Sequence, residues 1–340
     1  MKMKISKEKF GQLFDALAAE YQVIAPVSDT GGVRYKAVKK FSEVKQGYLN
    51  SKLPPKSFFF PQHEKLLSYK KEGKEITVKN ELKVEKTILF GIRPCDAKGF
   101  LLLDKVFKND QFTDPYYFER RDNTLVIGIA CHKIAPTCFC SSMGLSPATS
   151  VGSDIFLIDL GDSYQIEAVS DKGKLIMAGL VGLEELSTED QTLVDTITSV
   201  QTTSQVDVST ITAKLDKMFD NPYWDTLHEK CLSCNACSFS CPTCHCFDIS
   251  EEVLKNEGSR VRTWDGCMAP LFTLHGSGHN PRDQKKSRWR QRMLHKFNYF
   301  VHNNGDIACV GCGRCIKNCP VNLDIRQAID GVNKAELVVD

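Results

Sequence analysis

CLSCNACSFSCP, residues 231–242, and CVGCGRCIKNCP, residues 309–320, repeat one cysteine pattern, C-x2-C-x2-C-x3-C-P. This spacing is that of proteins with two [4Fe–4S] clusters, in which a tight loop presents three thiolates and the fourth cysteine, before the proline, ligates the other cluster. Structural zinc and disulfides are alternatives for a single C-x2-C, but two complete copies favour iron–sulfur clusters. We therefore predict two clusters that transfer electrons, with the ligand sets Cys231, Cys234, Cys237 and Cys319, and Cys309, Cys312, Cys315 and Cys241.

Length and composition indicate a two-domain protein of a reducing compartment. The 340 residues carry a formal net charge of +2 with 25% charged residues, so no global field favours nucleic acid or a membrane surface. The sequence has no apolar run of about 18 residues or more, and its N-terminus lacks the features of a signal peptide. The number of cysteines, 15, is odd, and eight belong to the doubled motif. We therefore expect a cytoplasmic protein from an organism living without much oxygen, with no membrane and no nucleic-acid partner.

The cysteines divide the chain into two parts. Residues 1–220 contain four of them together with the strand-like segments, whereas residues 221–340 contain the rest. A polar stretch rich in Ser and Thr, residues 187–209, precedes the change and places the boundary near Asn221. The predicted fold is α+β: an N-terminal α/β domain (1–220) with a partly parallel sheet, then a helical, ferredoxin-like domain (221–340) with two [4Fe–4S] clusters and a long basic insert at about 247–305.

Two apolar segments indicate the parallel part of the sheet. TILFGI (87–92) and TLVIGI (124–129) are continuous apolar runs, as expected for strands buried on both faces. Between them, Asp96 is predicted to be the N-cap of a helix through Phe107. The other predicted elements are an amphipathic helix at 6–20, short strands at 21–27 and 57–60, and a hairpin of 154–160 with 164–169.

Four cysteines follow these two strands. Cys95 comes just after the first and Cys131 directly after the second, while Cys138 and Cys140 share the loop that follows. Carboxyl ends of neighbouring parallel strands face one crevice, so the four thiols can meet at one point. Buried free cysteines acting as small hydrophobes are the alternative. We predict a third [4Fe–4S] cluster, which tolerates uneven ligand spacing where four sulfurs converge, on Cys95, Cys131, Cys138 and Cys140.

Three more cysteines lie close to the first motif or follow it. Cys244 and Cys246 come directly after that motif, and Cys267 stands in WDGC (264–267), with His245 or His279 as nearby histidines. These thiols either bind a further metal or pack around a cluster and donate weak hydrogen bonds to it. Both interpretations stay open at the level of the sequence.

The insert between the motifs is basic and contains a predicted helix. Trp289, Met293, Phe297 and Phe300 fall at i, i+4, i+8 and i+11, which defines one apolar face. The charges are then expected on the solvent side, at Arg260, Arg262, Arg282, Lys285, Lys286, Arg288, Arg290, Arg292 and Lys296. They indicate a solvated helix face, a docking surface for an acidic redox partner, or positive charge that stabilises reduced clusters.

Motifs for nucleotide binding and hydrolysis are missing from the sequence. No G-x-G-x-x-G follows a predicted strand, so we expect neither FAD nor NAD on this chain. G-x-S-x-G, H-E-x-x-H and P-loop motifs are also missing, and we assign no catalytic residue.

Several segments together resemble the iron–sulfur subunit of anaerobic sulfite reductases and the β subunit of cytoplasmic sulfhydrogenases. The resemblance covers most of the chain and is most specific at CFCSSMG (138–144) and CPTCHC (241–246). It includes WDGC (264–267), GHN (278–280) with Arg282, and CVGCGRC (309–315), whereas HGSG (275–278) departs from the family's usual Ala-Gly-Gly run. The resemblance implies a subunit that relays electrons between a flavin subunit that oxidises NAD(P)H and a separate catalytic redox subunit.

Two functions from different classes follow. The first is an electron-relay subunit without a catalytic centre of its own. The second is a self-contained oxidoreductase that uses the N-terminal cysteines as a substrate-binding metal centre. The two family branches differ chiefly in their partners, so the sequence leaves open whether sulfite, protons or another acceptor is reduced.

Overall fold

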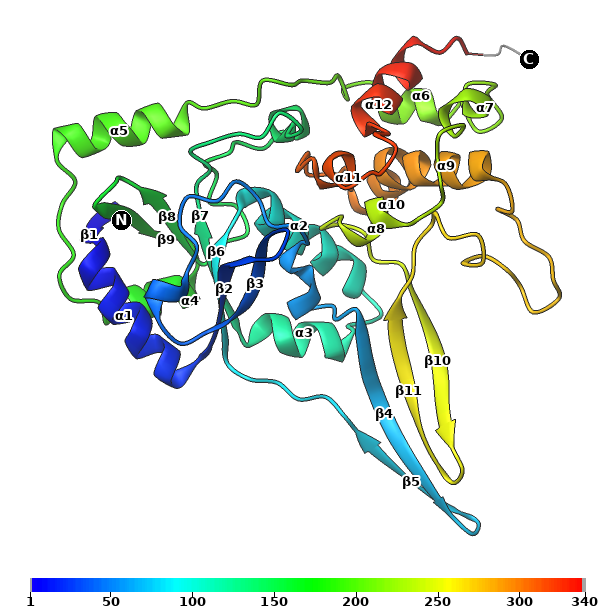
Figure 1. Ribbon diagram of the computed structural model, residues 1–340, viewed down its shortest axis with the longest axis horizontal. Helices are drawn as coiled ribbons and strands as arrows, with labels where there is room; N and C mark the ends of the chain where they lie inside the picture. Colours follow the sequence, from blue (N-terminus) through cyan, green and yellow to red (C-terminus); the bar gives the residue numbers. More distant parts are fainter. Residues whose placement is uncertain (1, 338–340) are drawn as a thin grey trace.

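A seven-stranded, partly parallel sheet forms the centre of the N-terminal part of the molecule (Figure 1). The computed structural model describes residues 2–337. The strands are β1 (Lys2–Ser6), β2 (Gln22–Asp29), β3 (Gly32–Val38), β6 (Thr87–Ile92), β7 (Thr124–Ile129), β8 (Ile155–Asp159) and β9 (Ser163–Ala168). Their order is β1-β9-β8-β7-β6-β2-β3. The central pairs β2–β6, β6–β7 and β7–β8 are parallel, and the outer pairs are antiparallel.

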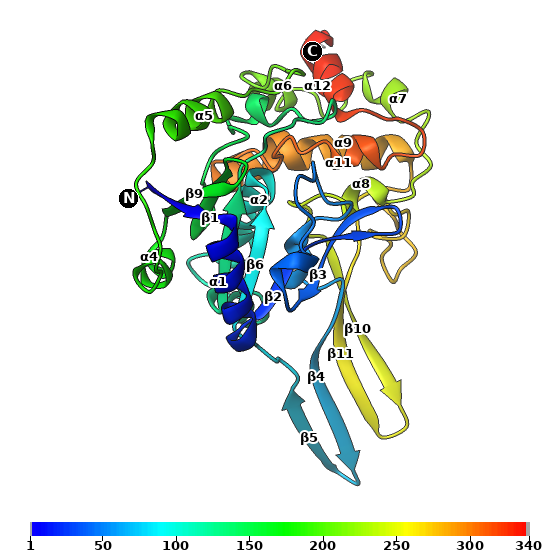
Figure 2. The ribbon, with the colours of Figure 1, turned by 60° about the vertical axis from the view of Figure 1, so that its left-hand side comes forward.

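Helices cover both faces of this sheet, as Figure 2 shows for α1. One face packs against α1 (Lys7–Glu20) and α4 (Asp171–Ala178), and the other against α2 (Pro94–Phe107) and α3 (Pro115–Asp122). Along β6 the side chains alternate: Phe90 packs with α1, whereas Leu89 packs with α2. Burial on both sides explains why β6 and β7 are continuous apolar runs, and it confirms the predicted α/β layer with a partly parallel sheet.

Most predicted elements of this layer are present, but the start of α2 was wrongly predicted. The helix α1 begins after Ser6, whose hydroxyl accepts a hydrogen bond from the backbone N–H of Lys9 at 3.3 Å. The hairpin of β8 and β9 is also present. The N-cap of α2 is Arg93, not Asp96, because Pro94 occupies the first helical position and the carboxylate of Asp96 pairs with Arg314 instead.

Residues 57–60 are not the predicted strand. They overlap a 3-10 helix, η2 (Pro55–Phe58), that follows Pro54. A proline has a fixed φ and no N–H to donate to a sheet ladder, so this segment turns rather than pairs. The apolar side chains enter the core instead: the Phe59 ring lies 4.8 Å from that of Phe100 and the Phe60 ring 5.6 Å from that of Trp264, between centroids.

A second sheet extends from the body as an arm (Figures 1 and 2). It consists of β4 (His63–Glu72), β5 (Glu75–Asn80), β10 (Phe247–Leu254) and β11 (Glu257–Trp264), in the order β10-β11-β4-β5. The pairing of β4 with β11 joins residues from both parts of the chain. Buried Arg262 fixes this pairing, donating to Glu64 at 2.7 Å and to Asp114 at 2.5 Å. The division at residue 220 stays a prediction, and the arm is shared across it.

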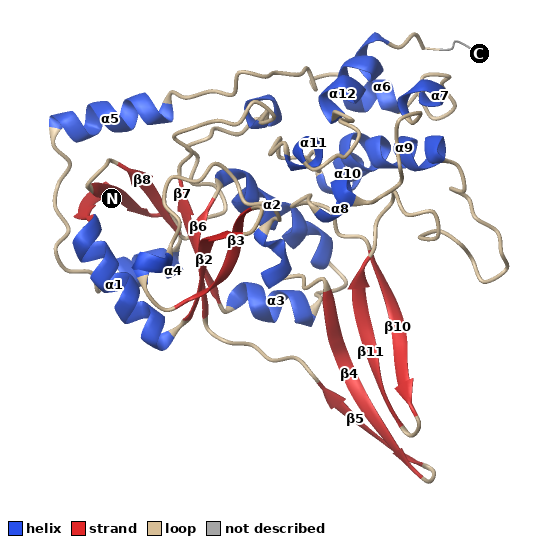
Figure 3. Cartoon of the chain, in the orientation of Figure 1, coloured by secondary structure: helices blue, strands red, loops and turns tan. Residues whose placement is uncertain are grey.

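The remaining helices gather mostly in the C-terminal part (Figure 3). They are α5 (Thr188–Thr198), α6 (Ile211–Leu215), α7 (Trp224–Leu227), α8 (Ala236–Phe239), α9 (Lys285–Leu294), the π-helix η4 (His295–Tyr299), α10 (Phe300–Asn304), α11 (Arg314–Lys317) and α12 (Ile325–Lys334). As predicted, Trp289, Met293, Phe297 and Phe300 are buried on one face of the insert helix. None of the helices described for residues 2–337 has both the length and the apolar character needed to cross a membrane.

Candidate metal centres

Each cysteine motif folds as a loop that ends in one turn of helix, α8 or α11. Equivalent positions of the two loops have equivalent, left-handed backbone angles: φ is 56° at Ser233 and 62° at Gly311, and 61° at Asn235 and 70° at Gly313. Such angles let a short loop turn its thiols inward, and glycine and asparagine adopt them at little cost. The two copies therefore follow the same backbone path, and each presents three cysteines.

The first motif site brings together cysteines from both motifs. One cavity is lined by Cys231, Cys234, Cys237 and Cys319. The backbone N–H groups of Ser233 and Leu323 donate to the sulfurs of Cys231 and Cys319 at 3.3 and 3.2 Å. The cysteine before Pro320 thus lies with the other motif, in the crossed arrangement that the sequence predicts for the ligands.

The second motif site lies around Cys241, with Cys309, Cys312 and Cys315. The Thr243 hydroxyl lies 3.1 Å from the Cys241 sulfur and donates to the Ala308 carbonyl at 2.8 Å, which ties Cys241 to the start of the second motif. Burial raises the pKa of the Cys309, Cys312 and Cys315 thiols, and Cys241 is close enough to all three to raise it further.

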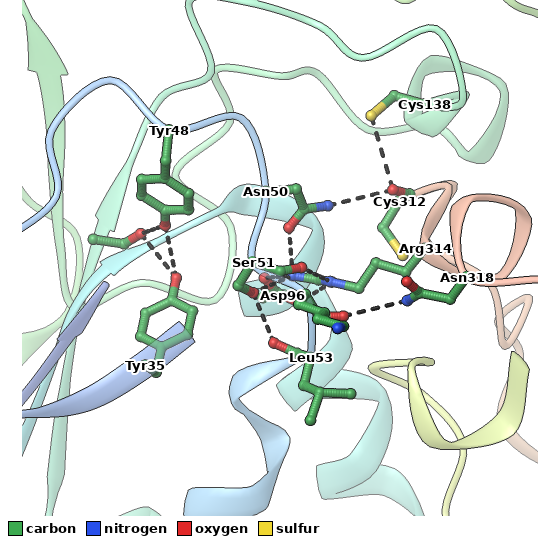
Figure 4. Close-up of polar contacts among 12 residues, drawn as sticks. Tyr35, Tyr48, Asn50, Ser51, Leu53, Asp96, Cys138, Cys312, Arg314 and Asn318 are labelled. Atoms are coloured by element: carbon green, nitrogen blue, oxygen red, sulfur yellow. Dashed lines mark hydrogen bonds and ion pairs between the residues drawn. The ribbon is translucent and has the colours of Figure 1, made fainter. Parts of the chain in front are cut away.

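The strand-end site consists of Cys95, Cys131, Cys138 and Cys140. Cys95 lies in the first turn of α2, after β6, and Cys131 follows β7. All four thiols line one cavity, which Cys312 of the second motif site also lines. The Cys138 sulfur lies 3.8 Å from the Cys312 carbonyl oxygen (Figure 4). The sheet therefore brings the four cysteines together at the carboxyl ends of neighbouring parallel strands, as the sequence predicts.

The strand-end site and the second motif site are packed closely together. A Cβ on Gly311 would lie 2.5 Å from the backbone nitrogen of Cys140, so only glycine fits there. Beside this contact, Arg314 and Asp96 form a buried bidentate ion pair, with N–O distances of 2.7 and 2.6 Å (Figure 4). The side chain of Asn50 accepts from Arg314 and donates to the Cys312 carbonyl at 3.3 Å. One polar network thus fixes the second motif loop against α2.

Within residues 2–337, several buried hydrogen-bond donors without a protein partner belong to residues that line two of these sites. In the first motif site they are Nε and Nη1 of Arg292 and Nε1 of Trp289, and in the strand-end site Nε of Arg93. A buried donor left unpaired costs about 1–3 kcal/mol, so a partner is expected in the cavity. The thiolates and sulfides of a [4Fe–4S] cluster are anionic acceptors, and a cluster therefore fits both the thiols and these unpaired donors.

Four basic residues of the insert are buried and not on the solvent side as predicted. Arg262 is buried in the arm, and Arg288, Arg292 and Lys296 are buried beside the cysteine loops. The Lys296 ammonium lies 3.3 Å from the Cys241 sulfur. The i, i+4 and i+8 spacing of the three residues beside the cysteine loops, parallel to the apolar row that begins at Trp289, is the sequence signal that could have placed them on the inner face.

The remaining three cysteines lie in two pairs, Cys244 with Cys241 and Cys246 with Cys267. A hydrogen bond from Cys246 lowers the pKa of Cys267 to about 6, and Cys244 in the same way lowers the pKa of Cys241. Within residues 2–337, no three His, Cys, Asp or Glu side chains are grouped to hold a single metal ion. Their nearest histidine, His245, packs on His295 with 5.2 Å between ring centroids, whereas His279 packs on His275. A metal role for these three cysteines stays a prediction.

Comparisons with known proteins agree with this geometry. A family model described as a 4Fe-4S dicluster domain matches residues 230–323, the segment that contains all eight cysteines of the doubled motif. The sulfhydrogenase 2 subunit beta from Pyrococcus furiosus is 32% identical over 348 residues, covering 98% of this chain and 98% of that protein. No solved structure matches the chain.

Proposed function

Since this chain belongs to the family of the sulfhydrogenase β subunits and is an iron–sulfur electron-transfer subunit, we propose that it connects two other subunits of a cytoplasmic oxidoreductase complex. One partner is a flavin subunit that oxidises NAD(P)H, and the other is a catalytic subunit that reduces the terminal acceptor. The complex is of the anaerobic sulfite reductase or sulfhydrogenase type.

The observation that carries the proposal is the order of the three cysteine sites. The second motif site shares Cys312 with the wall of the strand-end cavity and Cys315 with the wall of the first motif cavity. It therefore lies between the other two. Two partners that dock at opposite ends of such a row exchange electrons through it without touching each other.

We assign one [4Fe–4S] cluster to each site, including a third on Cys95, Cys131, Cys138 and Cys140. A [4Fe–4S] cluster bound there would supply one-electron transfer at each site. The chain's own residues hold the thiols, bury those of Cys231 and Cys241, and supply buried positive charge at Arg93, Arg292 and Lys296. Buried charge and hydrogen bonds to sulfur set how readily a cluster accepts an electron.

The alternative, a self-contained oxidoreductase, places substrate chemistry at the strand-end cavity. The contact of this site with Cys312 of the second motif site favours a relay, because it places the two cysteine sites side by side. Reduction of a dye by NAD(P)H, measured with the pure chain, distinguishes this alternative from the relay.

The test begins with the full chain purified under anaerobic conditions. Iron and sulfide analysis is expected to give about twelve of each per chain, for three clusters of four. Dithionite should bleach the cluster absorption, and neither NADH nor NADPH should do so until the flavin subunit is added. Reduction of a dye by NAD(P)H with the pure chain alone would contradict the relay, and an iron-free chain would contradict the cluster assignment.

A further inference from the structure

Lys296 is a buried lysine at a break in helix geometry. It lies in η4, a π-helix turn between α9 and α10, and its exposed fraction is 4%. Single π-helical turns are uncommon and are frequent at functional sites, because the extra residue redirects the side chains that follow. Here the turn belongs to the helix that packs beside both motif loops.

The Lys296 ammonium contacts three acceptors around the second motif site. Its Nζ lies 3.3 Å from the Cys241 sulfur, 3.2 Å from the Thr243 hydroxyl and 2.9 Å from the Ala308 carbonyl. Among the residues that the structure describes, no carboxylate lies within ion-pair distance of this nitrogen. Of its three contacts, the cysteine sulfur alone can carry a negative charge.

An ammonium buried without an anion is costly, so the charge of Lys296 requires a counter-charge nearby. The three atoms around the Lys296 nitrogen can all accept a hydrogen bond, which matches the three N–H donors of the ammonium form. Its counter-charge has to lie at the Cys241 sulfur.

We propose that Lys296 is the counter-ion of the cluster at the second motif site and favours the reduced state of that cluster. The inference rests on the proposed function, because it requires a cluster that Cys241 helps to hold. Reduction adds one electron to the cluster, supplied by a neighbouring cluster or by dithionite, and no proton moves and no bond breaks. A fixed ammonium against a ligating sulfur stabilises the additional negative charge, most strongly where water is excluded.

Two other buried cations, Lys56 and Arg292, do not contact a sulfur of the second motif site in this way. Lys56 donates to the Cys244 carbonyl at 2.5 Å and lies 4.1 Å from the centroid of the Trp264 ring, so its partners are a backbone oxygen and an aromatic face. Arg292 donates to the Cys237 carbonyl at 3.3 Å and lines the first motif site. Among the hydrogen bonds of residues 2–337, the contact of Lys296 Nζ with Cys241 is the one that joins a cation to a sulfur of the second motif site.

The experiment is a redox titration, followed by low-temperature EPR, of the anaerobically purified full chain and its Lys296→Met, Lys296→Gln and Lys296→Arg variants. The signal of the second motif site is identified as the one that Cys309→Ser alters. At a fixed potential, Met and Gln should lower the ratio of reduced to oxidised cluster at least tenfold, which for one electron is a downward shift of about 59 mV. Lys296→Arg should restore most of the ratio, because it keeps the charge.

Lys214→Met is the matched control. Lys214 also donates through Nζ to a backbone carbonyl, that of Asn333 at 2.6 Å, but it contacts no thiol, and its loss should leave the potential unchanged. A potential unaffected in Lys296→Met and Lys296→Gln, with the cluster present, would overturn the proposal. Equal loss of this cluster in Lys296→Met, Lys296→Gln and Lys296→Arg would also overturn the proposal. Retention of the cluster in Lys296→Arg alone would support it, because that variant keeps the positive charge. A wild-type chain without clusters is a different result, and it rejects the proposed function.

Discussion

The motif sites and the strand-end site bring cysteine sulfurs together in different ways. In a motif site, three thiols come from one loop whose left-handed residues set the turn, and the fourth comes from the other loop. In the strand-end site, the thiols come from three segments that only the parallel sheet brings together. Local spacing encodes the first kind of site, whereas tertiary structure encodes the second. The motif sites should therefore depend on their own loops, and the strand-end site on the integrity of the sheet.

The largest expected effect is the loss of the cluster at the first motif site in Cys319→Ala. Cys319 belongs to the second motif in sequence but lies with Cys231, Cys234 and Cys237 in space. Iron content should fall by about four per chain, and the EPR signal of the first motif site should disappear or change. Replacement of the neighbouring Asn318 by Ala is the control and should leave both unchanged. A change confined to the cluster of Cys309, Cys312 and Cys315 would show that the ligands do not cross.

Replacing Cys138 and Cys140 by Ser together should affect the strand-end site and leave both motif sites in place. Iron should fall from about twelve to about eight per chain, with the EPR signals of the motif sites retained. Because Cys312 contacts this site through its backbone, a small change in the signal of the second motif site is expected as well. A chain with about eight irons both before and after the substitutions would leave these four cysteines as buried thiols.

The ion pair of Asp96 with Arg314 connects α2, beside the strand-end site, to the second motif loop, and it can be tested by substitution. Asp96→Asn leaves Arg314 buried with an uncompensated charge, which typically costs about 3–5 kcal/mol of the free energy of unfolding. Denaturant unfolding under anaerobic conditions, before and after reduction of the clusters, measures this loss. The altered contact should also shift the EPR signal of the second motif site more than that of the first.

The smallest loss of stability is expected at the ion pairs between Asp306 and α2, the helix that also contains Asp96. Asp306 pairs with Lys98 and Lys105 of α2 at 3.3 and 2.5 Å, also connecting the two regions, but all three side chains are partly exposed. Asp306→Asn should therefore cost about 1 kcal/mol or less in the same unfolding measurement. Equal losses for Asp96→Asn and Asp306→Asn would show that the buried pair is not the stronger link between the regions.

The sequence predicted the sites that follow from local rules. The doubled spacing led to the crossed sets of cysteines, and the rule that parallel strands end at one edge led from two apolar runs to Cys95 and Cys131. The prediction from sequence was wrong where tertiary packing overrode the local propensity of a segment. The phenylalanines at 58–60 have strand propensity, but Pro54 and Pro55 precede them and the core accepts their rings, so they form a turn.

Two further features depend on contacts between segments that are distant in the sequence. Arg288, Arg292 and Lys296 were assigned to solvent because charged side chains usually lie there, yet all three are buried beside the cysteine loops. The pairing of β4 with β11 joins two hairpins of mixed polarity, far apart in sequence, whose exposed faces show little periodic pattern. The arm was therefore not predicted, although both of its hairpins have turns that a sequence can encode.

The arm also has a consequence for the order of events during synthesis. Glu64 of β4 and Arg262 of β11 are 198 residues apart, so at about 5–20 residues per second the ribosome needs roughly 10–40 s to make the second after the first. Until then β4 has an open edge, which is a template for association with other nascent chains. The strand that closes this edge is translated shortly after the first cysteine motif. Protection of the nascent chain from aggregation and the first opportunity for cluster insertion thus fall within the same short interval of translation.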